Sequence, residues 1–153
     1  MKGRHRVASF SGLEATTAAA SKVGRANRGC DTSSELVLRA ALRGLGLKYR
    51  VGHRTLPGHP DIVFPEHRVA VFCDGDFWHG RDWARRRAKL AKGSNSSYWV
   101  AKIGGNRARD RHVTRSLKLL GWQVVRVWES EVRGDADRIA HQIAELLAQR
   151  RLH

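Results

Sequence analysis

Two aspartates near the middle of the 153-residue chain, Asp61 and Asp74, have the spacing of a metal site. Asp61 directly precedes one apolar run, residues 62–64, and Asp74 directly follows a second, residues 68–73. If these runs pair as antiparallel strands, Asp61 lies opposite about Phe72, and alternation places both carboxylates on one side of the same end. Such carboxylates repel unless a cation lies between them, and Mg²⁺ prefers oxygen ligands. The pattern predicts a magnesium site, although a turn aspartate and a strand-ending aspartate also explain it.

Two further side chains near these aspartates can take part in proton transfer. His79 follows Asp74 closely, and a histidine beside a metal can activate water or protonate a leaving oxygen. The alternative is that it is structural or contacts a phosphate. Glu35 forms the sequence pattern of a capping box with Thr32, yet it can orient water or histidine if the first helix packs beside the hairpin.

Three aromatic side chains, Phe77, Trp78 and Trp99, lie in or near polar, arginine-rich stretches rather than in apolar runs. Exposed aromatics beside arginine are suited to stacking on bases or wedging between them. The alternative is that they cover the core. By contrast, Trp122 and Trp128 lie in a strand pattern, and we expect them in the core.

The charge of the chain favours a polyanionic partner. Its 29 Lys and Arg against 14 Asp and Glu give a formal net charge of +15. Such an excess is costly in a compact state and is typical of proteins that bind nucleic acid. The residues expected to contact DNA are Arg25, Arg81, Arg85, Arg86, Lys102, Asn106 and Arg109.

The elements that must position these residues can be read from the hydrophobic pattern. Residues 1–30 predict a flexible basic arm, and residues 31–153 a single folded domain. The pattern predicts helices at about 31–46, 97–120 and 135–150, strands at 47–51, 61–64, 68–73 and 122–128, and a long functional loop at 74–97. Gly104-Gly105 is expected to bend the second helix. This order predicts an α/β fold with a mixed sheet flanked by helices.

Nothing in the sequence indicates a membrane segment or a disulfide framework. No apolar run approaches the roughly 18 residues of a membrane span, and Cys30 and Cys73 have no CxxC partner. We therefore expect a reduced cytoplasmic protein that is associated with the nucleoid.

Five blocks of the sequence resemble the very short patch repair (Vsr) DNA mismatch endonuclease family. They fall in the order and spacing of that family and cover about residues 21–134. The blocks are Asp31-Thr32-Ser33-Ser34-Glu35, residues 56–64, Asp74-Gly75-Asp76-Phe77-Trp78-His79-Gly80, residues 98–110 and residues 121–129.

This resemblance implies a restriction-endonuclease-like fold of the PD-(D/E)XK type and Mg²⁺-dependent nicking beside a T:G mismatch, the product of 5-methylcytosine deamination. It further implies mismatched double-stranded DNA as partner and a possible mismatch-repair accessory protein. We expect a monomer because no pairing helix is evident.

The resemblance also implies roles for individual residues. Asp61 would ligate both metals, and the backbone carbonyl of Cys73 would help. His79 would be the general base, with Asp74 and Glu35 supporting water and geometry. The aromatic residues Phe77, Trp78 and Trp99 match the wedge that opens the duplex beside the mismatch, and the basic arm matches a segment laid along DNA.

Two departures from the family concern its structural zinc and its arm. The positions matching the zinc ligands are Asp76, Arg81, Trp83 and Ser130, which form no good ligand set. We therefore predict no zinc, with the loop held instead by Asp76 or Asp82 and a nearby arginine. The arm has Gly24 near the place of a methionine that family members push into the mismatch.

Two alternative functions remain open from the sequence. A related nuclease that cuts undamaged DNA at a specific site needs the same metal site but not the aromatic wedge. A DNA-binding module that has lost catalysis needs neither, and nothing in DNA binding requires carboxylates that face phosphates.

Overall fold

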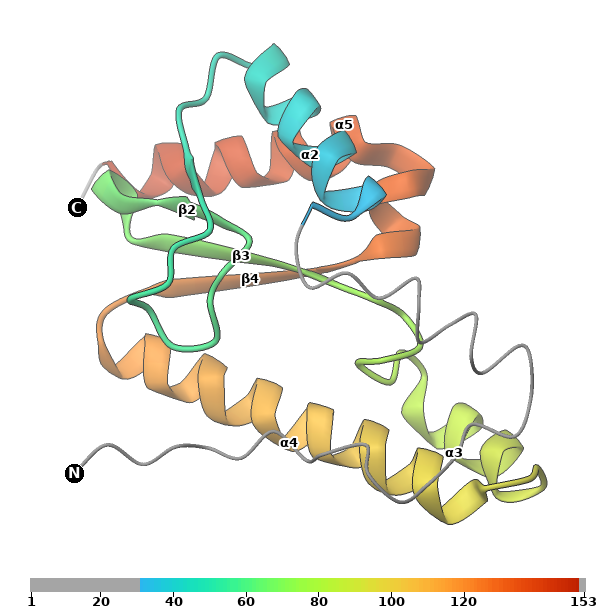
Figure 1. The fold of residues 1–153 in the computed structure, drawn as a ribbon. Helices are drawn as coiled ribbons and strands as arrows, with labels where there is room; N and C mark the ends of the chain where they lie inside the picture. The colour runs from blue at the N-terminus through green and yellow to red at the C-terminus, as the bar shows by residue number, and fades with distance from the viewer. Residues whose placement is uncertain (1–30, 152–153) are drawn as a thin grey trace.

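A four-stranded sheet with the strand order β1-β2-β3-β4 lies between two layers of helices in the computed structural model, which describes residues 31–151 (Figure 1). The elements are α2 (Ser33–Gly44), β1 (Arg50–Val51), β2 (Ile62–Phe64), the short 3-10 helix η1 (Pro65–His67), β3 (Val69–Asp74), α3 (Trp83–Ala91), α4 (Ser96–Leu119), β4 (Gln123–Trp128) and α5 (Glu129–Arg150). The predicted basic arm, including Arg25, lies outside the described residues.

The central hairpin confirms the predicted register. β2 pairs antiparallel with β3, and Phe64 lies opposite Val69. The backbone N–H of Asp61 donates to the carbonyl of Val71 at 3.0 Å, which extends the pairing by one residue beyond β2. Asp61 therefore lies opposite Phe72, as expected. β4 pairs parallel with β3, so the sheet is mixed, as the sequence predicted.

One face of the sheet packs against α2 and α5, which lie side by side above it in Figure 1. The helix α2 begins at Ser33 because the Thr32 side chain caps it, and Leu38 and Leu42 one turn apart are fully buried. They contact Ile143 of α5 and the strand residues of this face within one apolar cluster. This packing fixes the N-terminus of α2 near the end of β3.

The opposite face packs against α4. Ala70 and Phe72 of β3 form a smaller cluster with Val113 and Leu117 of the helix. The helix α4 is continuous through Gly104, so the bend predicted there does not interrupt the helix. Because α4 runs along β3 and β4 and continues past the end of β3 (Figure 1), its middle brings polar residues to the same end of the sheet as Asp74.

Four expectations about individual elements were wrong. Residues 74–97 are not a single long loop, because the helix-forming run at residues 83–91 folds as α3. The last helix begins at Glu129 rather than Asp135, and Asp135 is a non-helical break inside it. The predicted strand at 47–51 forms only at Arg50–Val51. Trp128 is half-buried but belongs to neither apolar cluster.

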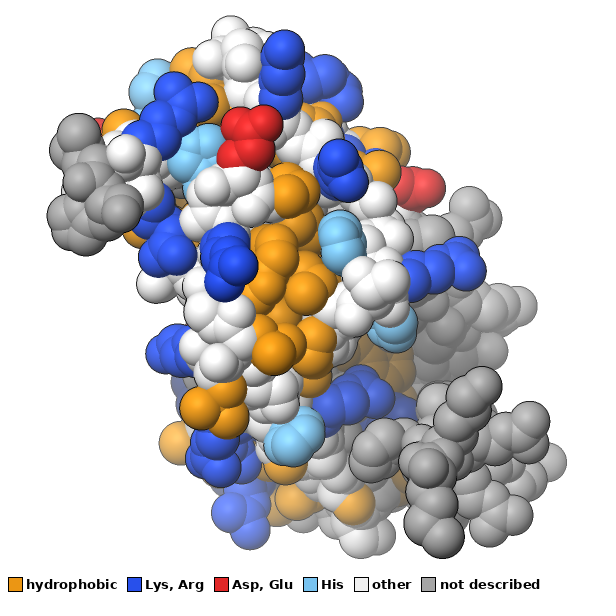
Figure 2. All heavy atoms as spheres, turned by 90° about the vertical axis from the view of Figure 1, so that its left-hand side faces the viewer, with side chains coloured by type: hydrophobic (Ala, Val, Ile, Leu, Met, Phe, Trp, Pro, Cys, Tyr) orange, Lys and Arg blue, Asp and Glu red, His pale blue; other side chains and the backbone are white. Residues whose placement is uncertain are grey.

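Positive charge is not confined to one side of the molecule. Figure 2 shows the side with η1, away from the end of β3 at which Asp74 lies, and there Lys and Arg surround an apolar strip with few acidic side chains. Charge alone therefore does not identify the functional surface. No helix within residues 31–151 is long and apolar enough to cross a membrane.

Candidate active site

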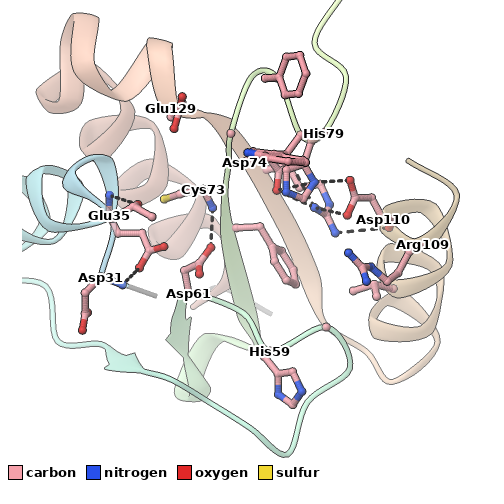
Figure 3. A pocket seen from close by; sticks show the side chains of 18 of the residues that line it. Asp31, Glu35, His59, Asp61, Cys73, Asp74, His79, Arg109, Asp110 and Glu129 are labelled. Atoms are coloured by element: carbon pink, nitrogen blue, oxygen red, sulfur yellow. Dashed lines mark hydrogen bonds and ion pairs between the residues drawn. The ribbon is translucent and has the colours of Figure 1, made fainter. Parts of the chain in front are cut away.

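A cleft of about 900 Å³ opens where β3 ends, bounded by the start of α2, the middle of α4 and the start of α5 (Figure 3). All four predicted catalytic residues line it: Asp61, Asp74, His79 and Glu35. In Figure 3 the carboxylates of Asp61 and Glu35 lie on the α2 side of β3, and the group around Asp74 and His79 lies toward α4. The cleft therefore has two sides.

On the α2 side, Asp61 is held by β3, the second strand of the hairpin. Its Oδ2 accepts a hydrogen bond from the backbone N–H of Cys73 at 2.8 Å. Burial raises the pKa of Asp61 to about 7, the Cys73 bond opposes that rise, and the charges of Glu35 and Asp74 add to it. Within residues 31–151 no Lys, Arg or His forms an ion pair with Asp61. Asp61 is therefore a buried carboxylate that has no ion pair within the part of the chain that the structure describes.

Glu35 is 3% exposed and lies next to Asp61. Its Oε2 accepts from the backbone N–H of Asp31 at 3.0 Å and pairs with Arg39 Nη2 at 3.2 Å. Only half of the predicted capping box forms: Thr32 accepts from the N–H of Glu35, whereas the Glu35 carboxylate bonds one residue further back. That displacement directs the carboxylate toward the cleft.

On the α4 side, His79 is oriented by an aspartate that the sequence analysis did not single out. Its Nδ1 lies 2.6 Å from Asp110 Oδ2 and 3.7 Å from Asp74 Oδ1. Burial disfavours the charged ring, but the Asp110 hydrogen bond and the charges of Asp74 and Asp110 outweigh it and raise the pKa of His79. With Nδ1 engaged by Asp110, the nitrogen left for chemistry is Nε2.

Asp74 is paired with an arginine from β4. Arg126 Nη1 donates to both carboxylate oxygens at 3.0 Å and lies 3.5 Å from Asp110 Oδ1. Burial raises the pKa of Asp74, while His79 and Arg126 oppose that rise. Among the described residues, the single group of three that could hold a metal by spacing is Asp74, His79 and Asp110.

A signal for Asp110 was present in the sequence, whereas the one for Arg126 was weak. Asp110 lies seven residues after the buried Ile103 and seven before the buried Leu117, so it continues the inward-facing stripe of α4. An acid on such a stripe is a candidate for function. Arg126 interrupts an otherwise apolar strand, which indicates a partner but does not identify it.

The three predicted wedge residues form one aromatic group beside the cleft. The ring centroids of Phe77 and Trp78 are 5.4 Å apart, those of Phe77 and Trp99 5.4 Å, and those of Trp78 and Trp99 5.9 Å. All three rings are half-buried. Asn106 Nδ2 donates to the backbone carbonyl of Trp78 at 2.8 Å, which ties the loop that carries these rings to α4. The rings meet edge to face or at a tilt and leave part of their surface to solvent.

The loop is also tied to the start of α5 by the interaction predicted for it. Arg81 Nη1 donates to Asp76 Oδ2 at 3.4 Å and to the hydroxyl of Ser130, and Asp76 Oδ1 accepts from the N–H of Ser130 at 3.2 Å. The Arg81 guanidinium also lies 5.9 Å from the centroid of the Trp128 ring. An aspartate and an arginine therefore hold the loop, and Arg81 is engaged within the protein. We call Asp76, Arg81 and Ser130 the loop clasp.

The other predicted DNA contacts lie on α3 and α4. Arg85 is exposed, and Arg86 lies with its guanidinium 5.5 Å from the Phe77 ring centroid. Arg109 is exposed, lines the cleft and donates to Asn106 Oδ1 at 3.3 Å. Lys102 is half-buried on the same helix. These side chains form a basic margin around the aromatic group and the cleft.

Comparison with known proteins identifies relatives of this chain. A family model described as DNA mismatch endonuclease Vsr matches residues 14–85. The type II nicking enzyme V.NmeDIP of Neisseria meningitidis serogroup C is 45% identical over 108 residues, which is 71% of this chain and 72% of the relative. The type II nicking enzyme V.HpaIIP of Haemophilus parainfluenzae is 36% identical over 129 residues, 84% of this chain and 89% of the relative. The DNA mismatch endonuclease Vsr of Escherichia coli K12 is 40% identical over 104 residues, 68% and 65%.

Proposed function

The chain belongs to the Vsr family of DNA mismatch endonucleases, so it is a DNA nicking endonuclease, and we propose that it nicks one strand beside a T:G mismatch with Mg²⁺ as cofactor. The observation that carries the proposal is the placement of Asp61, a buried carboxylate with no ion pair among residues 31–151, in the same cleft as His79, whose ring Asp110 orients. Phosphodiester hydrolysis needs both a cation beside the phosphate and a base near it.

The residues on the α2 side of the cleft fit the proposed Mg²⁺. Asp61 supplies a buried carboxylate, and burial together with the charges of Glu35 and Asp74 raises its pKa to about 7, so a cation beside it would be favoured. The N–H of Cys73 points to Asp61, and in a strand the carbonyl of the same residue points to the same edge, so it is directed to this side as well. Asp61 and the Cys73 carbonyl would hold the ion, with Glu35 beside them and Asp74 supporting the geometry from the His79 side. Bound Mg²⁺ supplies positive charge beside a phosphate and lowers the pKa of water.

The residues on the α4 side fit general-base catalysis. His79 Nε2 accepts the proton of the attacking water, because Nδ1 is held by Asp110. The negative charges of Asp74 and Asp110 stabilise the imidazolium that forms. Neither carboxylate needs to change protonation state in this step.

We further propose that Phe77, Trp78 and Trp99 insert beside the mispaired bases. Three half-buried rings in mutual contact present a rigid apolar edge, and such edges pry base steps apart. Arg85, Arg109 and the residues around them would hold the phosphates on either side. The proposal also includes a monomer that acts with an accessory repair protein. In it, the basic arm with Arg25 lies along the DNA.

The names of two relatives favour a second candidate. V.NmeDIP and V.HpaIIP are described as type II nicking enzymes, which is compatible with nicking at a specific site in fully paired DNA. That activity needs the two sides of the cleft but not the aromatic wedge. A DNA-binding protein without catalysis is disfavoured because Asp61 and His79 share one cleft.

One experiment separates these functions. End-labelled duplexes that differ only at one pair, T:G against C:G, are incubated with the protein and Mg²⁺ in several sequence contexts. A nick confined to the thymine strand of the mismatch supports the proposal, and equal cutting of both duplexes favours the second candidate. Tight binding without cutting in any context contradicts both.

A variant of the wedge sharpens the result. In Trp99→Ala, we expect the preference for T:G over C:G to fall about tenfold, because stacking on a base contributes about 1–3 kcal/mol. Trp122→Phe, on the other end of the sheet, is the matched control and should keep the preference. An unchanged preference in Trp99→Ala would contradict the role of the wedge.

A further inference from the structure

We propose that Arg126 is the resident cation of the Asp74–His79–Asp110 group: it positions both carboxylates around His79 and keeps divalent metal on the Asp61 side of the cleft. This inference rests on the proposed metal-dependent function, and it concerns how one cleft separates its metal from its base. Arg126 is a positioning residue in this proposal, because it acts through Asp74 and Asp110.

The side chain of Arg126 is anchored along its whole length. Its Nε donates to Thr114 Oγ1 at 3.1 Å, Nη1 donates to both oxygens of Asp74 at 3.0 Å, and Nη2 lies 3.5 Å from the carbonyl oxygen of Asp110. The guanidinium carbon lies 4.3 Å from the ring centroid of Phe72, the residue opposite it in the sheet. Contacts on every nitrogen and on the flat face leave this guanidinium one orientation.

That orientation places positive charge where a metal would otherwise bind. One ligand atom each from Asp74, His79 and Asp110 lies within 4.8 Å of the others, a spacing that suits a divalent ion. Arg126 Nη1 is already 3.0 Å from Asp74 and 3.5 Å from Asp110. A divalent ion at the usual distance of about 2.1 Å from the same oxygens would face this charge at close range. The two positive charges would repel each other at this distance.

The same contacts decide which carboxylate engages His79. Asp74 and Asp110 both approach Nδ1, at 3.7 Å and 2.6 Å. Arg126 draws the oxygens of Asp74 toward β4, and this leaves Asp110 as the hydrogen-bond partner of the ring. A single partner at Nδ1 fixes the tautomer and the direction of Nε2. Without Arg126, two adjacent carboxylates would compete for the histidine and for any cation.

The test measures metal binding and nicking separately in the full chain. Mn²⁺ serves as the probe, and its bound fraction without DNA is followed by electron paramagnetic resonance. We compare Arg126→Met, which removes the charge, Arg126→Lys, which keeps the charge but not the fork, and Arg115→Met, an exposed arginine of α4, as matched control. Circular dichroism shows which variants are folded.

We expect Arg126→Met to bind one further Mn²⁺ that Asp110→Asn in the same chain removes. Its kcat for nicking falls about 100-fold with little change in KM, because the base is misplaced while DNA binding is retained. Arg126→Lys gains no Mn²⁺ and nicks about tenfold more slowly. Arg115→Met matches the unmodified chain in both measurements.

Unchanged Mn²⁺ binding in a folded Arg126→Met would overturn the proposal. If that variant does not fold, Arg126→Lys decides, because an extra Mn²⁺ or an undiminished kcat in it contradicts the assigned role. The Mn²⁺ count does not depend on nicking, so a chain that nicks no DNA still tests Arg126. Conversely, if a folded Arg126→Met nicks DNA normally and binds as many Mn²⁺ ions as the unmodified chain, this inference is contradicted and the proposed function is left intact.

Discussion

Asp61 and Asp74 lie at the same end of one hairpin, and burial raises the pKa of both, yet their partners differ. Asp61 accepts one backbone hydrogen bond and has carboxylates as its charged neighbours. Asp74 is held by Arg126 and lies near His79. On the α2 side the arginine, Arg39, pairs with Glu35 and Asp31 and not with Asp61, whereas on the α4 side Arg126 pairs with Asp74 itself.

This difference assigns the two sides to different chemistry. A buried carboxylate without an ion pair attracts a cation from solution, whereas a carboxylate already paired with a guanidinium is preorganised and can support proton transfer without recruiting an ion. The predictions below test that division, beginning with the change expected to have the largest effect.

Asp61→Asn should abolish metal-dependent nicking, with a loss of at least about 1,000-fold in kcat, because the charge that attracts the cation is removed. Single-turnover nicking of the T:G duplex over a range of Mg²⁺ concentrations measures it. Asp137→Asn, an exposed aspartate of α5, is the control and should behave as the unmodified chain. If higher Mg²⁺ concentrations restored nicking by Asp61→Asn, Asp61 would strengthen metal binding without being required for it.

His79→Gln should lower kcat about 100-fold and leave Mn²⁺ binding unchanged, because general-base catalysis contributes on that order and the metal lies on the other side. The measurement pairs single-turnover nicking with the Mn²⁺ titration. A loss of Mn²⁺ affinity in His79→Gln would show that the two sides share an ion and would break the comparison.

The pH dependence of nicking by Asp110→Asn tests the same role of His79 as the base. Asp110 helps to raise the pKa of His79, so its removal lowers that pKa and the histidine is neutral at lower pH. The acid limb of the nicking rate should therefore move to lower pH, while the maximum rate falls because the ring loses its orientation. A limb that does not move would mean that His79 is not the group titrating there.

The hairpin could be derived from the sequence, but the partners of His79 and Asp74 could not. Strand alternation over residues 61–74 is a local rule, and it gave the register of the hairpin and the shared end of the two aspartates. It also predicted both carboxylates on one side, whereas Asp61 lies on the α2 side of β3 and Asp74 toward α4 (Figure 3). Asp110 lies 31 residues from His79, and Arg126 lies 52 residues from Asp74, so these contacts depend on how α4 and β4 pack. Local periodicity indicates that Asp110 faces inward, but it does not identify the residue that Asp110 contacts.

The misread helix ends have a similar cause. Asp82 precedes α3 with a positive φ of 52° and makes no side-chain capping bond, so no cap marks its start. The start of α5 depends on Glu131, whose Oε2 accepts from the N–H of Trp128 at 3.3 Å. Gly134-Asp135 gave a stronger start signal, which belongs to the second half of the same helix.

The unbalanced charge of Asp61 should also be visible in stability. An unfolded aspartate titrates near pH 4, and folded Asp61 titrates at about 7. Between these values the folded chain binds more protons, so its stability without metal falls as pH rises toward 7 and stays lower above it. Asp61→Asn should therefore be more stable than the unmodified chain at pH 8, by about 4 kcal/mol, and similar to it near pH 4.

Urea denaturation in the presence of a chelator measures this difference at both pH values. Addition of Mg²⁺ at pH 8 should stabilise the unmodified chain and leave Asp61→Asn unaffected, because ligand binding to the folded state adds stability. An equal difference at pH 4 and pH 8 would mean that Asp61 carries no charge penalty.

The smallest effect is expected for the loop clasp, which supports only the His79 side. Arg81→Met removes the charged hydrogen bonds of a side chain that is 31% exposed. The free energy of unfolding should therefore fall by about 1 kcal/mol. Arg87→Met, an exposed arginine of α3, is the control for the lost charge and should change stability little.

Urea denaturation of the two variants, with the Mn²⁺ titration beside it, tests the clasp and the comparison together. The loop carries Phe77 and His79 but not Asp61, so Arg81→Met should lower the nicking rate on T:G duplexes while Mn²⁺ affinity stays unchanged. If Mn²⁺ affinity falls with stability, the clasp supports the whole cleft, and the two sides are mechanically one unit despite their opposite charge. If only nicking falls, the loop positions the base independently of the metal.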